Sequence, residues 1–236
     1  MVVLLKMIKN WKLFASVSII LGPTQYIVFT AIAMFFYTGG TLVDPLNPGY
    51  YFWGNFFSDL GRVFALSGAP NFVSFTIFTI TALILSFSFI PFALIFSSYF
   101  KKHKKQYLIA RIGSLISLTS VVFLIITIFT PWDIFNRTHL MFANLFNITG
   151  IVGILFFTIA VFYNKDYPNL YGFVYVALLA VAAIYTIVLI SIPKSITLDG
   201  LILQASMQKI SQYSFLLCFL VQGFGVWKLQ KNNEIL

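Results

Sequence analysis

Six long apolar runs divide this sequence, and their length decides what the chain can fold into. They extend over Leu13 to Tyr37, Asn71 to Phe96, Tyr107 to Thr130, His139 to Tyr163, Leu170 to Ile192 and Ala205 to Leu229. Each reaches the ~20 residues that a helix needs to cross the hydrocarbon core of a bilayer. Only helices and closed barrels satisfy all their backbone hydrogen bonds in hydrocarbon, and these runs are not short alternating strands. The sequence therefore predicts an all-α integral membrane bundle of six transmembrane helices.

The composition agrees with a chain embedded in lipid. Hydrophobic residues make up 60% of the 236 positions and charged residues 9%, whereas soluble domains carry roughly 25% charged residues. The mean hydropathy is +0.94. Because most connectors between the runs are short, we expect residues 1–236 to form a single six-helix domain, a multi-pass protein of the cell membrane.

The distribution of charge predicts the orientation of the bundle. With the amino terminus in the cytoplasm, the cytoplasmic segments hold Lys6, Lys9, Lys12, Lys101, Lys102, Lys104, Lys105, Arg111, Lys165, Lys228 and Lys231 against Asp166 and Glu234. The external segments hold Arg62, Arg137, Lys194 and Lys209 against Asp44, Asp59, Asp133 and Asp199. This asymmetry is what the positive-inside rule describes. Both termini are therefore predicted to be cytoplasmic, and the net charge of +9 reflects topology and not a nucleic-acid partner.

This topology collects the unusual polar residues on the external side. The first external loop carries Asn55, Ser58, Asp59 and Arg62, and Asn71 opens the second span. The second external loop carries Asp133 and Arg137, and His139 starts the fourth span. Gln208 and Lys209 lie near the outer end of the sixth span. We expect a polar pocket on this side, built by Asn55, Ser58, Asp59, Asn71, Asp133, His139, Gln208 and Lys209.

Helical spacing indicates which faces of the fourth and sixth spans are directed toward the interior of the bundle. Gln204, Gln208 and Gln212 recur every four residues and so share one face of the sixth span. Asn144 and Asn147 fit one broad face of the fourth span together with His139. Because a polar face exposed to lipid is costly, both faces are expected to point into the bundle or into a water-filled vestibule.

Short motifs resemble a known family. They are Asn55-Phe56-Phe57-Ser58-Asp59-Leu60-Gly61, Pro70-Asn71-Phe72, and Thr130-Pro131 followed by His139-Leu140-Met141-Phe142-Ala143. The chain resembles the uncharacterised prokaryotic multi-pass membrane proteins of domain of unknown function 998. Met207-Gln208-Lys209-Ile210 departs from the acidic-basic pair expected there, because Gln208 stands in the acidic place. The six-helix layout is more distantly similar to the eukaryotic autophagy-modulator membrane proteins, some of which are linked to lipid handling.

The external residues allow a catalytic interpretation. Ser58, Asp59 and His139 are residue types of nucleophilic and general-base catalysis, provided that the imidazole lies within hydrogen-bond reach of its partner. Asp59 and His139 with Asp133 could also ligate zinc, but catalytic zinc sites commonly use two or three histidines and the external side offers one. The alternative function that these residues predict is a membrane-embedded hydrolase or transferase using Asp59 and His139, without an assigned metal or cofactor.

A structural interpretation competes with catalysis. Ser58 or Asp59 would cap a short external helix over Leu60 to Leu66 by accepting its free backbone amides. Asp59 would then pair with Arg62, Lys209 or Arg137, since charges at membrane depth usually pair with one another.

Ligand binding without chemistry is the interpretation that we favour from the sequence. An aromatic band lies at the interface, formed by Tyr50, Tyr51, Phe52, Trp53, Phe56, Phe57 and Trp132. Together with Arg62, Arg137 and Lys209 it could hold a lipid head group. The predicted ligand-binding residues are Asn55, Arg62, Asn71, Asp133, Arg137, Gln208 and Lys209, with membrane lipids as partners. Transport is the remaining alternative, and Gln25, Tyr26 and Asn147 would be its deeper residues.

Overall fold

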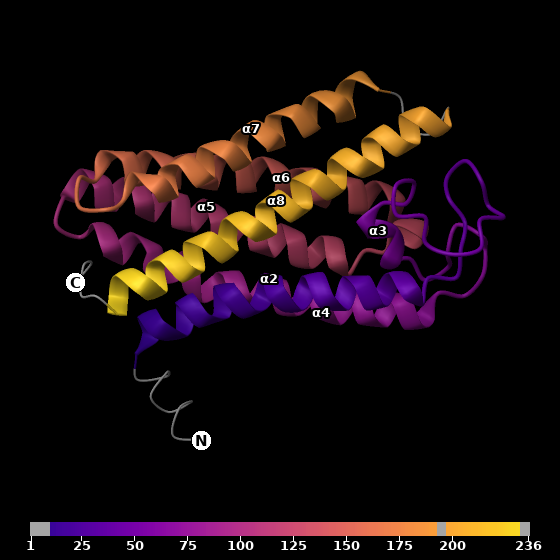
Figure 1. Cartoon of the computed structure of the whole chain (residues 1–236), viewed down its shortest axis with the longest axis horizontal. Coiled ribbons are helices and arrows are strands. Elements are labelled where there is room, and N and C mark those ends of the chain that lie inside the picture. Colours follow the sequence, from indigo (N-terminus) through magenta and orange to yellow (C-terminus); the bar gives the residue numbers. More distant parts are fainter. Residues whose placement is uncertain (1–9, 193–196, 232–236) are drawn as a thin grey trace.

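The computed structural model describes residues 10–192 and 197–231, which are helical over most of their length (Figure 1). The elements are α2 (Trp11–Phe35), α3 (Phe57–Leu60), α4 (Phe72–Phe96), the 3-10 turn η1 (Ser97–Phe100), α5 (Lys104–Ile128), α6 (Trp132–Tyr163), α7 (Asn169–Ser191) and α8 (Leu198–Lys231). All but α3 belong to 6 segments long and apolar enough to cross a membrane, one of which joins α4 and η1. The predicted all-α six-helix membrane fold is confirmed.

Two helices begin seven residues earlier than the sequence predicted. Helix α6 starts at Trp132 and not at His139, and α8 starts at Leu198 and not at Ala205. Their first turns carry polar residues, so hydropathy does not assign these turns to a span although the backbone is already helical. Phe135 interrupts α6 with φ −119° and ψ 41°. The outer turn of α6 therefore bends away from the apolar part of the helix.

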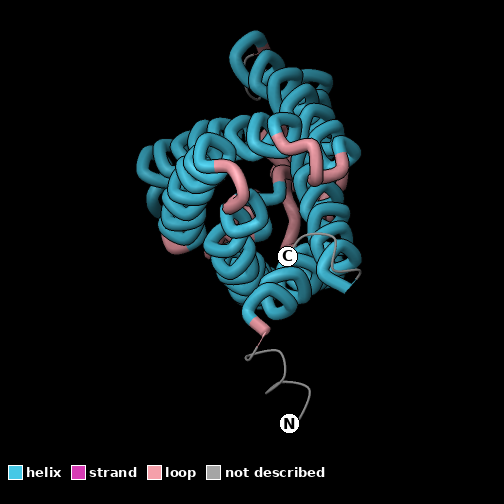
Figure 2. The backbone as a smooth tube through the Cα atoms, turned by 90° about the vertical axis from the view of Figure 1, so that its left-hand side faces the viewer, coloured by secondary structure: helices cyan, strands magenta, loops and turns pink. Residues whose placement is uncertain are grey.

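The six long helices form a closed ring. Each packs against its neighbours in the sequence, from α2 against α4 to α7 against α8, and α8 completes the ring by packing against α2 (Figure 2). The first residue of α2 and the last of α8 lie at the same end of the bundle (Figure 1). We call this the inner end, following the cytoplasmic side predicted from the charges. The opposite end, which carries α3, is the outer end.

Aromatic side chains fill the ring at its inner end. Phe96 of α4 meets Phe157 of α6 with ring centroids 4.2 Å apart. Tyr175 of α7 and Phe219 of α8 are also in contact, at 6.3 Å. All four side chains are buried, and aromatic pairs at these separations stabilise beyond their buried area. The inner end of the ring thus contains a packed aromatic core.

Candidate functional site

A folded connection covers the outer end of the ring. It consists of residues 36–71, which we call the outer loop, and it contains α3 (Figure 1). Asn55 is fully buried at its centre and holds three parts of it together. Its side-chain oxygen accepts from the amide of Tyr51 at 2.8 Å, and its side-chain nitrogen donates to the carbonyl of Gly40 at 2.9 Å and to Asp59 at 3.2 Å. Asn55 is therefore an organising residue of the loop.

Asp59 lies inside α3 and is completely buried. Its Oδ2 accepts hydrogen bonds from the backbone amide of Phe56 at 2.8 Å and from the side chain of Asn55 at 3.2 Å. Its Oδ1 is buried without a hydrogen-bond partner among the described residues. Burial removes water from the carboxylate and raises the pKa of Asp59 above its ordinary value. This environment favours the protonated carboxyl group.

The structure corrects the predicted role of Asp59 as the cap of a helix over Leu60 to Leu66. The helix is Phe57–Leu60, and Asp59 bonds backward to its amino-terminal end. Residues 61–66 are not part of the helix, and the amides of Val63 and Phe64, which a continuing helix would use, bond to the carboxylate of Asp133. Among the described residues, the one ion pair is between Lys102 and Asp166, at 3.6 Å. Asp59 therefore forms no direct ion pair with Arg62, Lys209 or Arg137.

Lys209 reaches the outer loop from α8. Only 2% of the side chain is exposed, and its Nζ donates a hydrogen bond to the backbone carbonyl of Asn55. Three aromatic rings surround the ammonium group, with Phe52 at 5.1 Å, Tyr50 at 5.5 Å and Phe57 at 5.6 Å from ring centroid to Nζ. Cation–π attraction of this kind compensates part of the cost of burying the charge. Lys209 thus fastens the loop to the bundle.

Two amide side chains that were predicted to bind a ligand also attach the outer loop to the bundle. The side-chain oxygen of Gln208 accepts from the backbone amide of Phe57 at 2.8 Å. Asn71 is fully buried, and its side chain donates to the carbonyls of Leu60 at 3.3 Å and Arg62 at 2.9 Å. These bonds connect the outer loop to α8 and to the start of α4. They satisfy backbone groups that would otherwise be buried without partners.

Asp133 and Arg62 join the outer loop to the first turn of α6. The carboxylate of Asp133 accepts from the amides of Val63 at 3.3 Å and Phe64 at 2.9 Å. Arg62 lies over the ring of Trp132 at 5.5 Å and donates through Nε to the carbonyl of Phe64 at 3.1 Å. Arg137, by contrast, is exposed on α6.

Ser58 and His139 line a cavity of about 210 Å³ beneath the outer loop, which we call the smaller cavity. The Nδ1 of His139 lies 2.7 Å from the carbonyl oxygen of Thr130. Because a carbonyl only accepts, this nitrogen carries the proton. Asp59 is not among the residues that line the smaller cavity. The Oδ2 of Asp59 accepts hydrogen bonds from Phe56 and Asn55, and its Oδ1 has no hydrogen-bond partner among the described residues.

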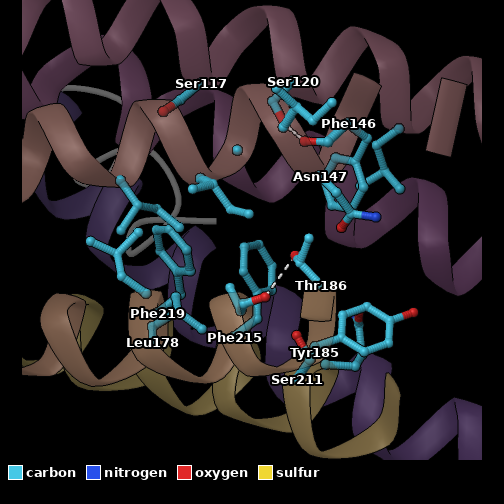
Figure 3. A pocket seen from close by; sticks show the side chains of 18 of the residues that line it. Ser117, Ser120, Phe146, Asn147, Leu178, Tyr185, Thr186, Ser211, Phe215 and Phe219 are labelled. Carbon is cyan, nitrogen blue, oxygen red and sulfur yellow. Dashed lines mark hydrogen bonds between the residues drawn. The ribbon is translucent and has the colours of Figure 1, made fainter. Parts of the chain in front are cut away.

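A larger cavity of about 540 Å³ lies deeper and is lined by residues of α4, α5, α6, α7 and α8. Figure 3 shows its labelled α5 and α6 residues on one side and its labelled α7 and α8 residues on the other. Its inner end is apolar, with Phe92, Phe157 and Phe219, and Phe89 also lines it. The two cavities share part of their lining and so adjoin, and this shared part consists of Leu124, Asn144, Phe146, Asn147, Tyr185, Leu189, Ser211, Gln212 and Phe215.

The larger cavity opens sideways between α6 and α7. Ile148 of α6 and Ile190 of α7 both line it and are 59% and 81% exposed. A residue that lines a cavity and is also this exposed lies at its mouth. Helices α6 and α7 also diverge toward the outer end (Figure 1). The mouth therefore faces the region that lipid occupies around a membrane-spanning bundle.

Asn144 and Asn147 line both cavities from α6. The described residues give neither side-chain amide a hydrogen-bond partner. Asn147 lies with Ser120 and Phe146 on one side of the larger cavity, opposite Tyr185 and Ser211 (Figure 3). An unpaired amide at membrane depth is costly, so these groups require water or a bound molecule in the cavity.

The polar residues of the sequence thus belong to two different places. Asn55, Asp59, Asn71, Asp133, Gln208 and Lys209 hold the outer loop on the bundle, whereas Ser58 and His139 line the smaller cavity together with Gln208. Sequence reasoning missed the hydroxyl groups of the larger cavity, which are Ser117, Ser120, Tyr185, Thr186 and Ser211. A signal was present, because Ser211 adjoins Gln212 and Tyr185-Thr186 interrupts an apolar span.

The fold and the cavities define a multi-pass membrane protein with a laterally open intramembrane cavity. Among residues 10–192 and 197–231, no group of three or more His, Cys, Asp or Glu side chains comes together as a metal site would require. Comparison of the chain with protein-family models, curated proteins and solved structures found no match.

Proposed function

We propose that this protein binds a single membrane lipid or similar amphiphile in the larger cavity. The supporting observation is the combination of an apolar inner end, unpaired amides on α6 and a mouth toward the lipid. A volume of about 540 Å³ falls within the range of roughly 300–1,000 Å³ that is usual for small-molecule sites. An acyl chain would lie along Phe89, Phe215 and Phe219, and the polar head would reach Asn144 and Asn147.

The outer loop would act as the lid of this site. Ser58 and Gln208 line the smaller cavity, and Gln208 also binds the amide of Phe57 in the loop. The bonds made by Lys209 and Asp133 hold the lid in place. Binding would therefore proceed through the lateral mouth while the outer end stays covered.

Catalysis by Asp59 and His139 receives less support. The Asp59 carboxyl group is used by the loop backbone, and it does not line either cavity. A general base has to approach the proton that it removes. The lipid-binding proposal needs no such pairing.

A matched pair of tryptophan variants tests the proposal. Ala182 lines the larger cavity, whereas Ala183, the next residue of α7, is exposed and does not line it. Wild type, Ala182→Trp and Ala183→Trp are purified in the same uncharged detergent and compared by native mass spectrometry. We expect a lipid retained at one per chain in wild type and Ala183→Trp, with at least fivefold lower occupancy in Ala182→Trp. Equal occupancy in all three would refute binding in this cavity.

A further inference from the structure

The described lining of the larger cavity contains polar groups but no Asp, Glu, Lys, Arg or His side chain. Its polar members are the amides of Asn144, Asn147 and Gln212 and the hydroxyls of serine, threonine and tyrosine residues. The lining of the adjoining smaller cavity also contains no Asp, Glu, Lys or Arg, and His139 is its one imidazole. The nearby cations point elsewhere. Lys209 is enclosed by rings of the outer loop, and Arg137 is exposed on α6 and lines neither of the two cavities described. A bound head group therefore meets hydrogen-bonding groups without a countercharge.

The depth of Asn147 in the membrane adds to the cost of a charged head group in this cavity. Asn147 lies in the middle of α6, which extends over Trp132–Tyr163. In a bilayer, the middle of a spanning helix lies near the centre of the hydrocarbon core. A charge at this depth is expensive unless it is paired with an opposite charge. An uncharged polar group needs only hydrogen bonds, and Asn147 has both a donor and an acceptor available.

On the basis of the proposed lipid-binding function, we propose that the larger cavity selects amphiphiles with an uncharged, hydroxyl-bearing head group of the acylglycerol type. A hydroxyl donates and accepts, as do the amides of Asn144, Asn147 and Gln212 and the hydroxyl of Ser211 that surround it. A phosphate or carboxylate in the same place would lose its hydration and gain no cation. The selectivity thus arises from the cost imposed on charged head groups.

Two lipids that differ in one group test this selectivity. Monooleoylglycerol and oleoyl lysophosphatidic acid share the chain and the glycerol, and only the second carries a phosphate. Each is titrated into the delipidated full-length protein in an uncharged detergent, and binding is followed by native mass spectrometry. We expect monooleoylglycerol to bind at least tenfold more tightly. Asn147→Lys, which places a cation beside the head group, is expected to reverse this preference, whereas Asn136→Lys on the exposed outer turn of α6 is not.

The outcomes separate this inference from the function on which it rests. Equal binding of both lipids, lost in Ala182→Trp, would overturn the head-group selectivity and leave lipid binding in the cavity intact. A tenfold preference that persists unchanged in Ala182→Trp would place the selective site elsewhere and overturn both proposals. Absence of binding by either lipid would also overturn both.

Discussion

The ammonium group of Lys209, on α8, donates a hydrogen bond to the backbone carbonyl of Asn55, in the outer loop. The two residues are far apart in the sequence, and each is almost completely buried. Asn55 in turn donates to the carboxylate of Asp59. A buried cation and a buried carboxyl group are thus connected through one asparagine, and the outer loop is attached to the bundle at this point.

Replacing Lys209 by methionine should loosen the outer loop. The variant keeps the apolar stem but removes the hydrogen bond to Asn55 and the attraction to the rings of Phe52 and Tyr50. A hydrogen bond to a charged group contributes about 1.5–3 kcal/mol, and we expect a loss of about 2 kcal/mol in the free energy of unfolding. Thermal unfolding in detergent measures the effect.

Lys228→Met is the matched control for this prediction, because Lys228 is an exposed residue of the same helix. Its unfolding midpoint should stay within the error of wild type. If Lys209→Met and Lys228→Met unfold at the same temperature, Lys209 does not fasten the loop.

Asp59 should make stability depend on pH. Burial raises the pKa of this carboxyl group above its ordinary value of 3.8, so the folded protein binds the proton more tightly than the unfolded chain. The stability that the folded protein gains from this tighter proton binding is fully present below pH 3.8. It is lost as pH rises through the raised pKa of the folded state. Asp59→Asn cannot titrate. The unfolding temperature of wild type should therefore fall relative to that of Asp59→Asn as pH rises across this window.

Asp199→Asn controls for the general effect of removing a carboxylate, since Asp199 is exposed in the first turn of α8. Its pH profile should follow that of wild type. Parallel profiles for wild type and Asp59→Asn would show that Asp59 does not titrate differently in the folded and unfolded states.

The positions of the spans could be predicted because hydropathy is a property of consecutive residues. Helices α4 and α7 begin and end within a residue or two of the predicted limits. The outer turns of α6 and α8 could not be assigned in this way. They contain Asp133 and Asp199, whose carboxylates are costly in the hydrocarbon core. These residues are tolerated because the outer turns of both helices extend beyond the hydrocarbon. The 34 residues of α8 correspond to roughly 51 Å, well above a hydrocarbon core of about 30 Å.

The partners of the polar residues depend on how the helices are rotated against one another. The spacing of Gln204, Gln208 and Gln212 correctly predicted an inward face, but not that Gln208 would bind the amide of Phe57 while Gln212 lines the cavities. Ser117 and Ser120 carried no distinctive pattern, because single hydroxyls occur on any face of a membrane helix. Their place in the cavity follows from the ring of helices and not from local sequence.

Asp133 should control the local opening of the outer loop. Its carboxylate accepts from the amides of Val63 and Phe64, and hydrogen bonds of this charge-assisted kind are among the stronger ones. Asp133→Ala leaves both amides without this acceptor and should increase their rate of hydrogen exchange at least tenfold. Asp133→Asn retains one acceptor oxygen and should give a smaller increase. Unchanged exchange at residues 63 and 64 in Asp133→Ala would contradict this assignment.

The orientation of the ring can be tested by cysteine labelling. The charge distribution predicts that His103, between η1 and α5, faces the cytoplasm and that Ser67, in the outer loop, faces outward. Both residues are exposed. In a Cys218→Ala background, a membrane-impermeant maleimide should label Ser67→Cys in intact cells and His103→Cys only after permeabilisation. Cys218 itself is buried in α8, so the parent protein should give little background in either condition. The reverse pattern would place the outer loop and the covered end of the cavity on the cytoplasmic side, while the lateral mouth between α6 and α7 would still face lipid.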